Sequence, residues 1–205
     1  MIVIVDYGMG NLRSILYKIE KLKGVVSISS NIEAIEQADK LILPGVGYFA
    51  KGMENIHSRK LYDVLNKRVC IDKIPVLGIC LGAQLITRYS EEGNAEGFGW
   101  IDAETKKFSF DISDRALRIP HVGWNAIEIV RSSPLLHGIE PHNRFYFTHS
   151  YYIDCKQTDA CVANTYYGLS FTSAIQKDNI FGTQFHPEKS HHAGRAILEN
   201  FITRC

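Results

Sequence analysis

The sequence has almost no excess of charge, no apolar run long enough to cross a membrane, and no segment of low complexity. Lys and Arg together number 23 and Asp and Glu together number 22, so the formal net charge is only +1. This balance gives no electrostatic reason to expect a nucleic acid or an anionic membrane as a partner. The apolar start at residues 2–5 meets Asp6 and has no basic leader, so it predicts neither a signal peptide nor a membrane span.

Cysteines are few and irregularly spaced. They form no CxxC pair, and neither they nor the histidines complete a zinc-ligand pattern. Their five positions are Cys70, Cys80, Cys155, Cys161 and Cys205. An odd number of cysteines without a spacing pattern predicts reduced thiols, and therefore a cytoplasmic protein. We also expect this protein to need no metal or other cofactor. A length of 205 residues suits one domain, which we expect to span residues 1–205.

Strand-like and helix-like segments alternate through the first half of the chain. Short β-branched runs predict strands, and apolar residues at three- and four-residue spacing predict helices. The predicted strands lie at residues 2–5, 25–29, 41–43 and 75–79, and the predicted helices lie near residues 12–22, 31–37 and 59–68. Repeated strand–helix–strand units imply a parallel sheet covered on both faces.

The pattern changes from about Phe98 onward, where short alternating runs predict further strands, some of them antiparallel. These runs lie at residues 127–130, 144–148, 161–166, 171–175 and 180–184. A last helix carries Ala196, Ile197, Asn200 and Phe201 on one side. The predicted fold class is therefore α/β: a single three-layer α/β/α domain with a central mixed, mainly parallel sheet.

Gly78-x-Cys80-x-Gly82 lies between a predicted buried strand and a helix that begins near Leu81. This spacing is typical of a nucleophile elbow, here with cysteine in the serine position. The helix N-terminus would stabilise a Cys80 thiolate, and the Leu81 backbone N–H would donate to an oxyanion. A buried structural cysteine in a glycine-containing turn is the alternative. A redox-sensing cysteine is a further one, although no resolving cysteine lies nearby.

A cysteine nucleophile that expels ammonia needs a base that later acts as an acid. His186 follows the predicted strand near the C-terminus, and Glu188 lies two residues on, across a proline. Glu188 can accept a hydrogen bond from the imidazole and fix its tautomer. A metal site formed with His191 and His192, or a simple strand end followed by a turn, are the competing interpretations.

Together, Gly78-Ile-Cys80-Leu-Gly82-x-Gln84 and Gln184-Phe-His186-Pro-Glu188 resemble the motifs of class I (triad) glutamine amidotransferases, and the similarity covers the whole chain. The resemblance implies that Cys80 is the nucleophile, His186 the base and acid, and Glu188 the residue that orients the imidazole.

Four further segments resemble the glutaminase subunits of imidazole glycerol phosphate synthases. They begin at Asp6, Pro44, Pro120 and Tyr146. In that group the Pro-Gly-Val-Gly segment supplies the second oxyanion donor and rearranges when the partner binds, which points here to Val46 and Gly47. Glycine permits such a peptide rotation.

The resemblance also implies contacts with substrate and partner. The glutamine contacts map onto Gly47, Gln84, Glu92 and Ser150, and the partner-facing positions onto Asn11, Trp124 and Lys189. Gln84 as a helix-surface amide and Glu92 as a solvated acid are the alternatives. For Lys189 the alternative is an ordinary exposed lysine.

The implied reaction is hydrolysis of L-glutamine to glutamate and ammonia through a thioester. The acceptor chemistry would lie on a separate (β/α)8 cyclase that forms a heterodimer with this chain and takes the ammonia for histidine biosynthesis. We expect glutaminase activity to be low in the isolated chain. Three rivals remain: a paralogue that serves sugar amidation in surface polysaccharide synthesis, a stand-alone γ-glutamyl hydrolase or cysteine peptidase, and a non-catalytic scaffold.

Overall fold

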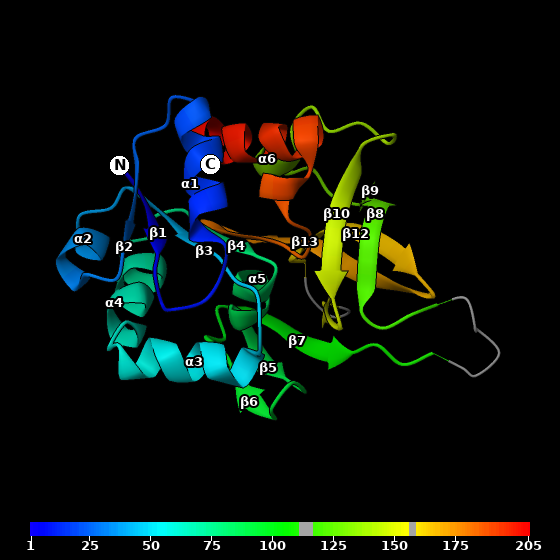
Figure 1. Cartoon of the computed structure of the whole chain (residues 1–205), viewed down its shortest axis with the longest axis horizontal. Coiled ribbons are helices and arrows are strands. Elements are labelled where there is room, and N and C mark those ends of the chain that lie inside the picture. Colours follow the sequence, from blue (N-terminus) through cyan, green and yellow to red (C-terminus); the bar gives the residue numbers. More distant parts are fainter. Residues whose placement is uncertain (111–116, 156–158) are drawn as a thin grey trace.

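A mixed β-sheet forms the centre of the computed structural model, which describes residues 1–110, 117–155 and 159–205 (Figure 1). The strands found in these residues are β1 (Ile2–Val5), β2 (Val26–Ser29), β3 (Lys40–Leu43), β4 (Val76–Ile79), β5 (Thr87–Ser90), β6 (Ala95–Glu96), β7 (Ile101–Lys107), β8 (His121–Ala126), β9 (Glu128–Ile129), β10 (Arg144–His149), β11 (Tyr151–Asp154), β12 (Cys161–Tyr167), β13 (Leu169–Lys177) and β14 (Ile180–Thr183). Hydrogen-bonded neighbours follow the order β2-β1-β3-β4-β14-β13-β11-β7-β5-β6, with β12 between β13 and β9.

The sheet changes direction at β14. Strands β2, β1, β3, β4 and β14 pair in parallel, whereas β13 pairs antiparallel with β14. Strands β4 and β14 are paired through Gly78 with Gly182 and Ile79 with Thr183. Their carboxyl ends therefore lie side by side, and the two segments that carry the predicted nucleophile and base leave the sheet at the same edge.

Helices cover both faces of the parallel part (Figure 1). Their bounds are α1 (Leu12–Lys21), α2 (Ile32–Glu36), α3 (Phe49–Ser58), α4 (Tyr62–Asn66), α5 (Leu81–Leu85) and α6 (His191–Arg204), with a π-helical turn η1 (Lys67–Ile71) and 3-10 turns η2 (Pro134–Leu136) and η3 (Pro187–Lys189). One hydrophobic cluster joins residues of α1 and α6, and the other joins residues of α2, α3 and α4. The predicted three-layer α/β/α arrangement is confirmed.

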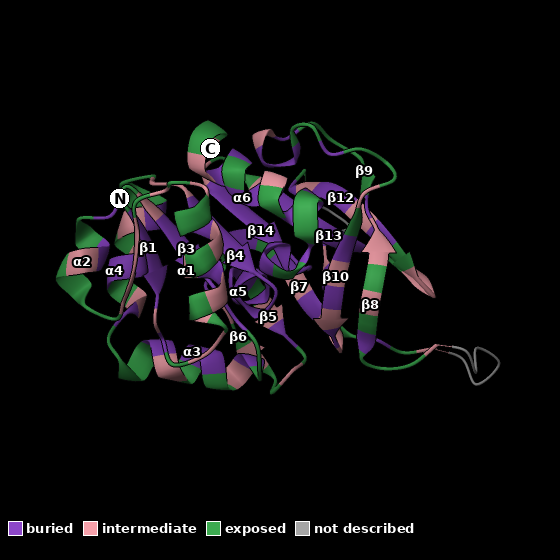
Figure 2. Ribbon diagram, turned by 45° about the horizontal axis from the view of Figure 1, so that its top comes forward, coloured by how far each residue is buried: buried purple, intermediate pink, exposed green. Residues whose placement is uncertain are grey.

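Alternation along β1 shows why two layers of helices are needed. Ile2 and Ile4 belong to the cluster under α1 and α6, whereas Val3 and Val5 belong to the opposite cluster. Successive strand side chains point to opposite faces, so a fully apolar strand requires cover on both sides. Figure 2 shows the resulting buried strands β1, β3, β4 and β14 between helices with exposed outer faces. Each fully buried aliphatic side chain contributes about 1.5–3 kcal/mol to stability.

Several elements differ from the sequence-based expectation. Helix α3 was not expected, although Phe49, Met53 and Ile56 recur at helical spacing and are buried. Gly52, in the interior of this helix, is a poor helix former. The helix packs closely against Leu85 of α5 at this position, and a larger residue would crowd the Leu85 side chain. The helix expected at 59–68 begins only at Tyr62 and continues as a π-helical turn.

Strands β5, β6, β7, β8 and β11 were not identified from the sequence either. Strand β8 pairs with β10 in a separate two-stranded ladder, in which His121 lies opposite His149. Such long-range pairings compensate for weak local patterns. Within the described part of the chain, no helix has both the length and the apolarity that crossing a bilayer requires.

Candidate active site

Cys80 occupies a sharp turn between β4 and α5. Its backbone has φ 51° and ψ −106°, a conformation that non-glycine residues rarely adopt. The Cys80 N–H donates to the Thr183 carbonyl at 2.7 Å, which holds the turn against the end of β14. Helix α5 begins at Leu81, as expected. The backbone strain thus fixes the cysteine side chain at the edge of the sheet, next to the segment that follows β14.

Two glycines make this turn possible. A Cβ atom on Gly82 would lie 1.7 Å from the Leu43 carbonyl oxygen, and one on Gly78 would lie 2.7 Å from the Ala83 nitrogen. Both obstacles are backbone atoms, which have no rotamer that relieves the contact. The glycines therefore leave room for neighbouring backbone, as the spacing predicts.

His186 and Glu188 form a buried pair directly beyond β14. The imidazole Nδ1–H donates to Glu188 Oε1 at 2.8 Å, and both side chains are 2% exposed. Glu188 lies in the short turn η3, whose first residue is Pro187. With Nδ1 held in this way, Nε2 is the reactive end of the ring. Among the described residues, neither His186 Nε2 nor Glu188 Oε2 has a hydrogen-bond partner.

The electrostatics of the pair favour a charged imidazole. Burial lowers the pKa of His186, but the Cys80 sulfur and the Glu188 carboxylate outweigh burial and raise that pKa to about 10. The ring therefore holds its proton at neutral pH and loses it as the pH rises through the raised pKa. Sulfur, imidazole and carboxylate are thus coupled at one edge of the sheet, an arrangement that suits acyl transfer with the imidazolium as proton donor.

A cavity of about 330 Å³ opens beside Cys80. Its lining contains every residue predicted to contact glutamine or to supply oxyanion donors, and the full set is Val46, Gly47, Cys80, Leu81, Gln84, Glu92, Pro120, Thr148, His149, Ser150 and Tyr151. These residues come from the segment after β3, the elbow with α5, the loop after β5, the residue just before β8, and the ends of β10 and β11 where the two strands connect. Cys80, the predicted nucleophile, therefore faces a recess lined by both polar and apolar groups, which a small molecule can enter.

The surface interpretation of Gln84 is wrong, whereas Glu92 is partly exposed to solvent. Gln84 is 4% exposed, and its Nε2 donates to the Tyr151 carbonyl at 2.9 Å. Glu92 is half-buried, and its Oε2 accepts from the Phe49 N–H at the start of α3 at 2.8 Å. Burial raises the pKa of Glu92, although the hydrogen bond from Phe49 opposes that rise. Both side chains are held in place at the cavity wall.

Sequence reasoning assigned no role to Tyr7, which is fully buried near the nucleophile. Its hydroxyl donates to the Pro44 carbonyl, and burial, followed by the nearby Cys80 sulfur, raises the pKa of the phenol. The phenol therefore stays protonated and anchors the start of the 44–47 segment. Beyond that anchor, Val46 and Gly47 are exposed, and Gly47 has a φ of +124°. Tyr7 lies within one of the segments that carry the family resemblance, which was the available signal.

The predicted partner-facing residues lie at the surface. Trp124 is 46% exposed and stacks in parallel on His191, with ring centroids 4.9 Å apart. Lys189 is exposed, with its ammonium 5.5 Å from the centre of the Tyr146 ring. Asn11 is exposed and caps α1 through a hydrogen bond from the Ser14 N–H. This capping hydrogen bond is a structural role for Asn11 that requires no partner protein.

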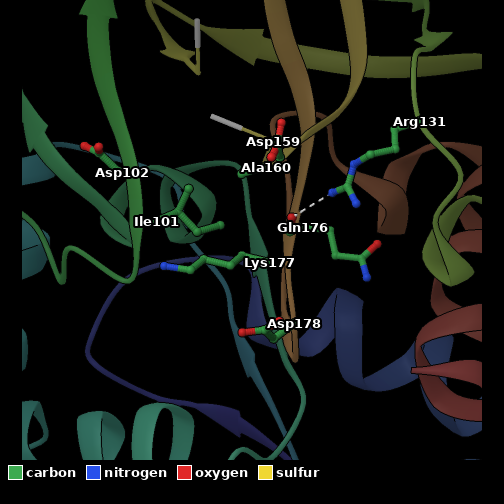
Figure 3. A pocket seen from close by; sticks show the side chains of 8 residues that line it. All are labelled: Ile101, Asp102, Arg131, Asp159, Ala160, Gln176, Lys177 and Asp178. Carbon is green, nitrogen blue, oxygen red and sulfur yellow. Dashed lines mark hydrogen bonds between the residues drawn. The ribbon is translucent and has the colours of Figure 1, made fainter. Parts of the chain in front are cut away.

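Another cavity, of about 390 Å³, lies at β7 and β13 (Figure 3). Charged side chains from several elements surround it, and Arg131 donates to the Gln176 carbonyl at 3.0 Å. The described residues that line it are Ile101, Asp102, Arg131, Asp159, Ala160, Gln176, Lys177 and Asp178. The described part of this lining contains no thiol, hydroxyl or imidazole group, whereas the cavity beside Cys80 contains the predicted cysteine nucleophile. Across residues 1–110, 117–155 and 159–205, no group of His, Cys, Asp and Glu has the geometry of a metal site.

Comparison with known proteins finds relatives that match this chain over nearly its whole length. A family model described as glutamine amidotransferase class-I matches residues 3–205. The chain belongs to the class-I glutamine amidotransferase family. A relative from Leptospira interrogans, named imidazole glycerol phosphate synthase subunit HisH, is 45% identical over 203 residues, which are 99% of this chain and 100% of that protein. A Methanococcus maripaludis protein named imidazole glycerol phosphate synthase subunit HisH 2 is 48% identical over the full length of both chains.

Solved structures of amidotransferases share the fold. PurLQS from Thermotoga maritima matches with a TM-score of 0.71 at 15% identity, covering 98% of this chain and 96% of that one. The glutaminase domain of CTPS from Trypanosoma brucei matches with a TM-score of 0.62 at 16% identity, covering 97% of this chain and 91% of that one. At these identities the likeness shows the fold alone, so the chemistry of this amidotransferase rests on its own residues and on its family.

Proposed function

We propose that this chain is the glutaminase subunit of an imidazole glycerol phosphate synthase, which releases ammonia from L-glutamine and delivers it to a (β/α)8 cyclase for histidine biosynthesis. The observation that carries the proposal is the coupling of Cys80 to the buried His186–Glu188 pair at the paired ends of β4 and β14. Full-length relatives with that name support the choice of pathway. The proposal takes residues 1–205 as one catalytic domain that works in the cytoplasm as half of a heterodimer.

The proposed cycle is acyl transfer with balanced proton movements. The Cys80 thiolate attacks the side-chain amide carbon of glutamine, and the carbonyl oxygen becomes an oxyanion. The His186 imidazolium gives its proton to the departing amine, so ammonia leaves and a γ-glutamyl thioester remains. A water molecule, deprotonated by the now neutral His186, attacks the thioester and releases glutamate. Glu188 keeps Nδ1 protonated throughout, which leaves Nε2 as the atom that exchanges the proton.

Backbone N–H groups are the proposed oxyanion donors. Leu81 supplies one at the first turn of α5, where helix N–H groups have no intrahelical acceptor. The peptide between Val46 and Gly47 supplies the other. The positive φ of Gly47 lets this peptide rotate without the steric cost that a side chain would add, and the Tyr7 bond to the Pro44 carbonyl anchors the start of the 44–47 segment. This combination supports a donor that moves into place when the partner binds.

Binding of glutamine uses the cavity wall. Glu92 pairs with the substrate α-ammonium through its carboxylate, and Ser150 and Gln84 supply neutral polar contacts. The Nε2 of Gln84 is already engaged, so its carbonyl oxygen is the atom available to the substrate. The residues proposed to face the cyclase are Trp124, Lys189 and Asn11. Trp124 offers an exposed aromatic ring and Lys189 an exposed cation.

Glu92→Gln is expected to raise the KM for glutamine about tenfold or more and to leave kcat within about threefold, because a hydrogen bond to a charged group contributes about 1.5–3 kcal/mol. The glutamine side chain still accepts from the Phe49 N–H, so the start of α3 keeps its bond. Steady-state ammonia release measures both constants. Glu91→Gln, on the neighbouring residue outside the cavity, is the matched control. A KM equal to that of the control would remove Glu92 from the substrate site.

The proposed function is tested by measuring ammonia release from glutamine with the chain alone, with the histidine-pathway cyclase, and with the cyclase homologue of a surface-sugar pathway. We expect low activity alone and an increase of about 10²-fold or more with the first partner and its ligand, since the proposed oxyanion donor is worth about 10²–10³ in kcat. Rescue of a histidine auxotroph is the matching test in cells. Full activity without a partner, or stimulation by the second partner only, would contradict the proposal.

A further inference from the structure

A buried side-chain network reaches the Cys80 sulfur through Gln184, a residue with no role assigned so far. Gln184 is fully buried between β14 and His186, and its Nε2 donates to the Cys80 sulfur at 3.7 Å. Its Oε1 accepts from Gln84 Nε2 at 3.1 Å. The backbone of Gln184 is held as well, because its N–H donates to the Ser173 carbonyl at 2.9 Å. The backbone at Gln184 is therefore fixed to β13, and its side-chain amide cannot turn away from the sulfur without losing the bond from Gln84.

The direction of both amides follows from their partners. The Tyr151 carbonyl can only accept, so the Gln84 atom 2.9 Å from it must be the nitrogen. That nitrogen also faces Gln184, which therefore turns its oxygen toward Gln84 and its NH2 group toward Cys80. A flipped Gln184 would place two NH2 groups together and a carbonyl oxygen against the sulfur. The network thus presents a donor to the nucleophile.

A neutral histidine, His149, holds the Tyr151 carbonyl in position, and a second, His121, holds His149. His149 Nδ1–H donates to that carbonyl at 2.7 Å, so Nε2 of His149 accepts from His121 Nδ1–H at 3.1 Å. Burial lowers the pKa of His149 to about 3 and the pKa of His121 to about 4. Both rings therefore stay neutral across the working pH range, and the donor at the sulfur does not depend on their titration.

A further polar contact of the sulfur has the opposite preference. The Thr148 carbonyl oxygen lies 3.9 Å from Sγ and accepts only from a protonated thiol. A thiolate loses this bond but strengthens the one from Gln184, because hydrogen bonds to charged groups are the stronger kind. We propose that Gln184 is a catalytic residue whose amide stabilises and aims the Cys80 thiolate, with Gln84 positioning that amide. This inference rests on the proposed function, in which Cys80 is the nucleophile.

The test compares the native chain with Gln184→Met, which keeps the length of the side chain but cannot donate. Alkylation of Cys80 by iodoacetamide is followed against pH by peptide mass spectrometry, a readout that needs no glutamine. We expect the rate at pH 7 to fall about tenfold and the acidic limb of the profile to move to higher pH. We also expect kcat for ammonia release to fall about tenfold with KM nearly unchanged.

Asn200→Leu is the matched control, since Asn200 is a buried amide bonded to the Leu135 and His137 carbonyls in a different part of the core. It should lower stability without moving the alkylation profile. If Gln184→Met does not fold, Gln184→Leu decides, because it is apolar and brings neither a donor nor a charge to the sulfur. If the pH profile of Cys80 alkylation is unchanged in a folded Gln184 variant, the role of Gln184 is overturned. The proposed function of Cys80 is not affected by that result. Alkylation of native Cys80 no faster than that of exposed Cys70 would instead count against Cys80 as nucleophile.

Discussion

Replacement of Cys80 by alanine is expected to abolish ammonia release from glutamine, with a loss of about 10⁴-fold or more, because no other group can form the thioester. The substitution should leave the fold intact. Cys80 already carries a Cβ at positive φ, so alanine adds no new steric conflict at the elbow. The measurement is glutamine-dependent ammonia release by the complex, with circular dichroism to verify folding.

The matched control is Cys70→Ala, since Cys70 is an exposed thiol outside the cavity. Covalent labelling by a glutamine-analogue electrophile should disappear in Cys80→Ala and persist in Cys70→Ala. In a complex with the cyclase, Cys80→Ala should still support the acceptor reaction when ammonium salt replaces glutamine. Retention of glutaminase activity by Cys80→Ala would show that a different nucleophile does the chemistry.

Glu188→Gln is expected to lower kcat about 10³-fold and to move the alkaline limb of the pH–kcat/KM profile to lower pH. The direction of this shift follows from the interaction of Glu188 with His186. Glu188 is one of the groups that raise the pKa of His186 against the effect of burial, so its neutral replacement lowers that pKa. The imidazolium, which protonates departing ammonia, is then lost at a lower pH. The glutamine amide can also bind Nδ1 in the wrong tautomer, which adds to the loss in kcat.

The control for this change is Glu54→Gln, because Glu54 is an exposed glutamate that pairs with Lys51 at the surface. It removes the same charge without touching His186 and should leave both kcat and the pH profile unchanged. Thermal unfolding of both variants separates a loss of catalysis from a loss of fold. An alkaline limb that stays in place in Glu188→Gln would mean that the carboxylate does not set the protonation of His186.

Local sequence patterns determined the parts of this protein that depend on neighbours along the chain. The spacing of Gly78, Cys80 and Gly82 predicted an elbow because a tight turn has few backbone solutions, and the glycines do meet backbone atoms. His186 and Glu188 were paired correctly because a two-residue offset across a proline leaves little freedom. The amphipathic repeat of α1 marked a helix whose apolar side, with Ile15 and Ile19, is buried.

Contacts between distant segments could not be derived in this way. The parallel pairing of β4 with β14, about 100 residues apart in the chain, is what brings the elbow beside the base. Helix α3 has a glycine in its interior, and strand β8 finds its only described pairing with β10, so neither is clear without its tertiary neighbours. Gln184 belongs to the motif that contains His186 and Glu188, but the direction of its amide could not be derived from that motif, because its side-chain partners, Cys80 and Gln84, lie about 100 residues away in the chain.

The sequence by itself therefore predicted which groups would carry the chemistry and the local backbone that presents each one. Only the tertiary structure decided their mutual placement, the direction of the buried amides, and which polar side chains lie at the cavity rather than at the surface. The physical reason is that turns and helix faces are set by interactions over a few residues, whereas burial and hydrogen-bond partners depend on how the sheet assembles.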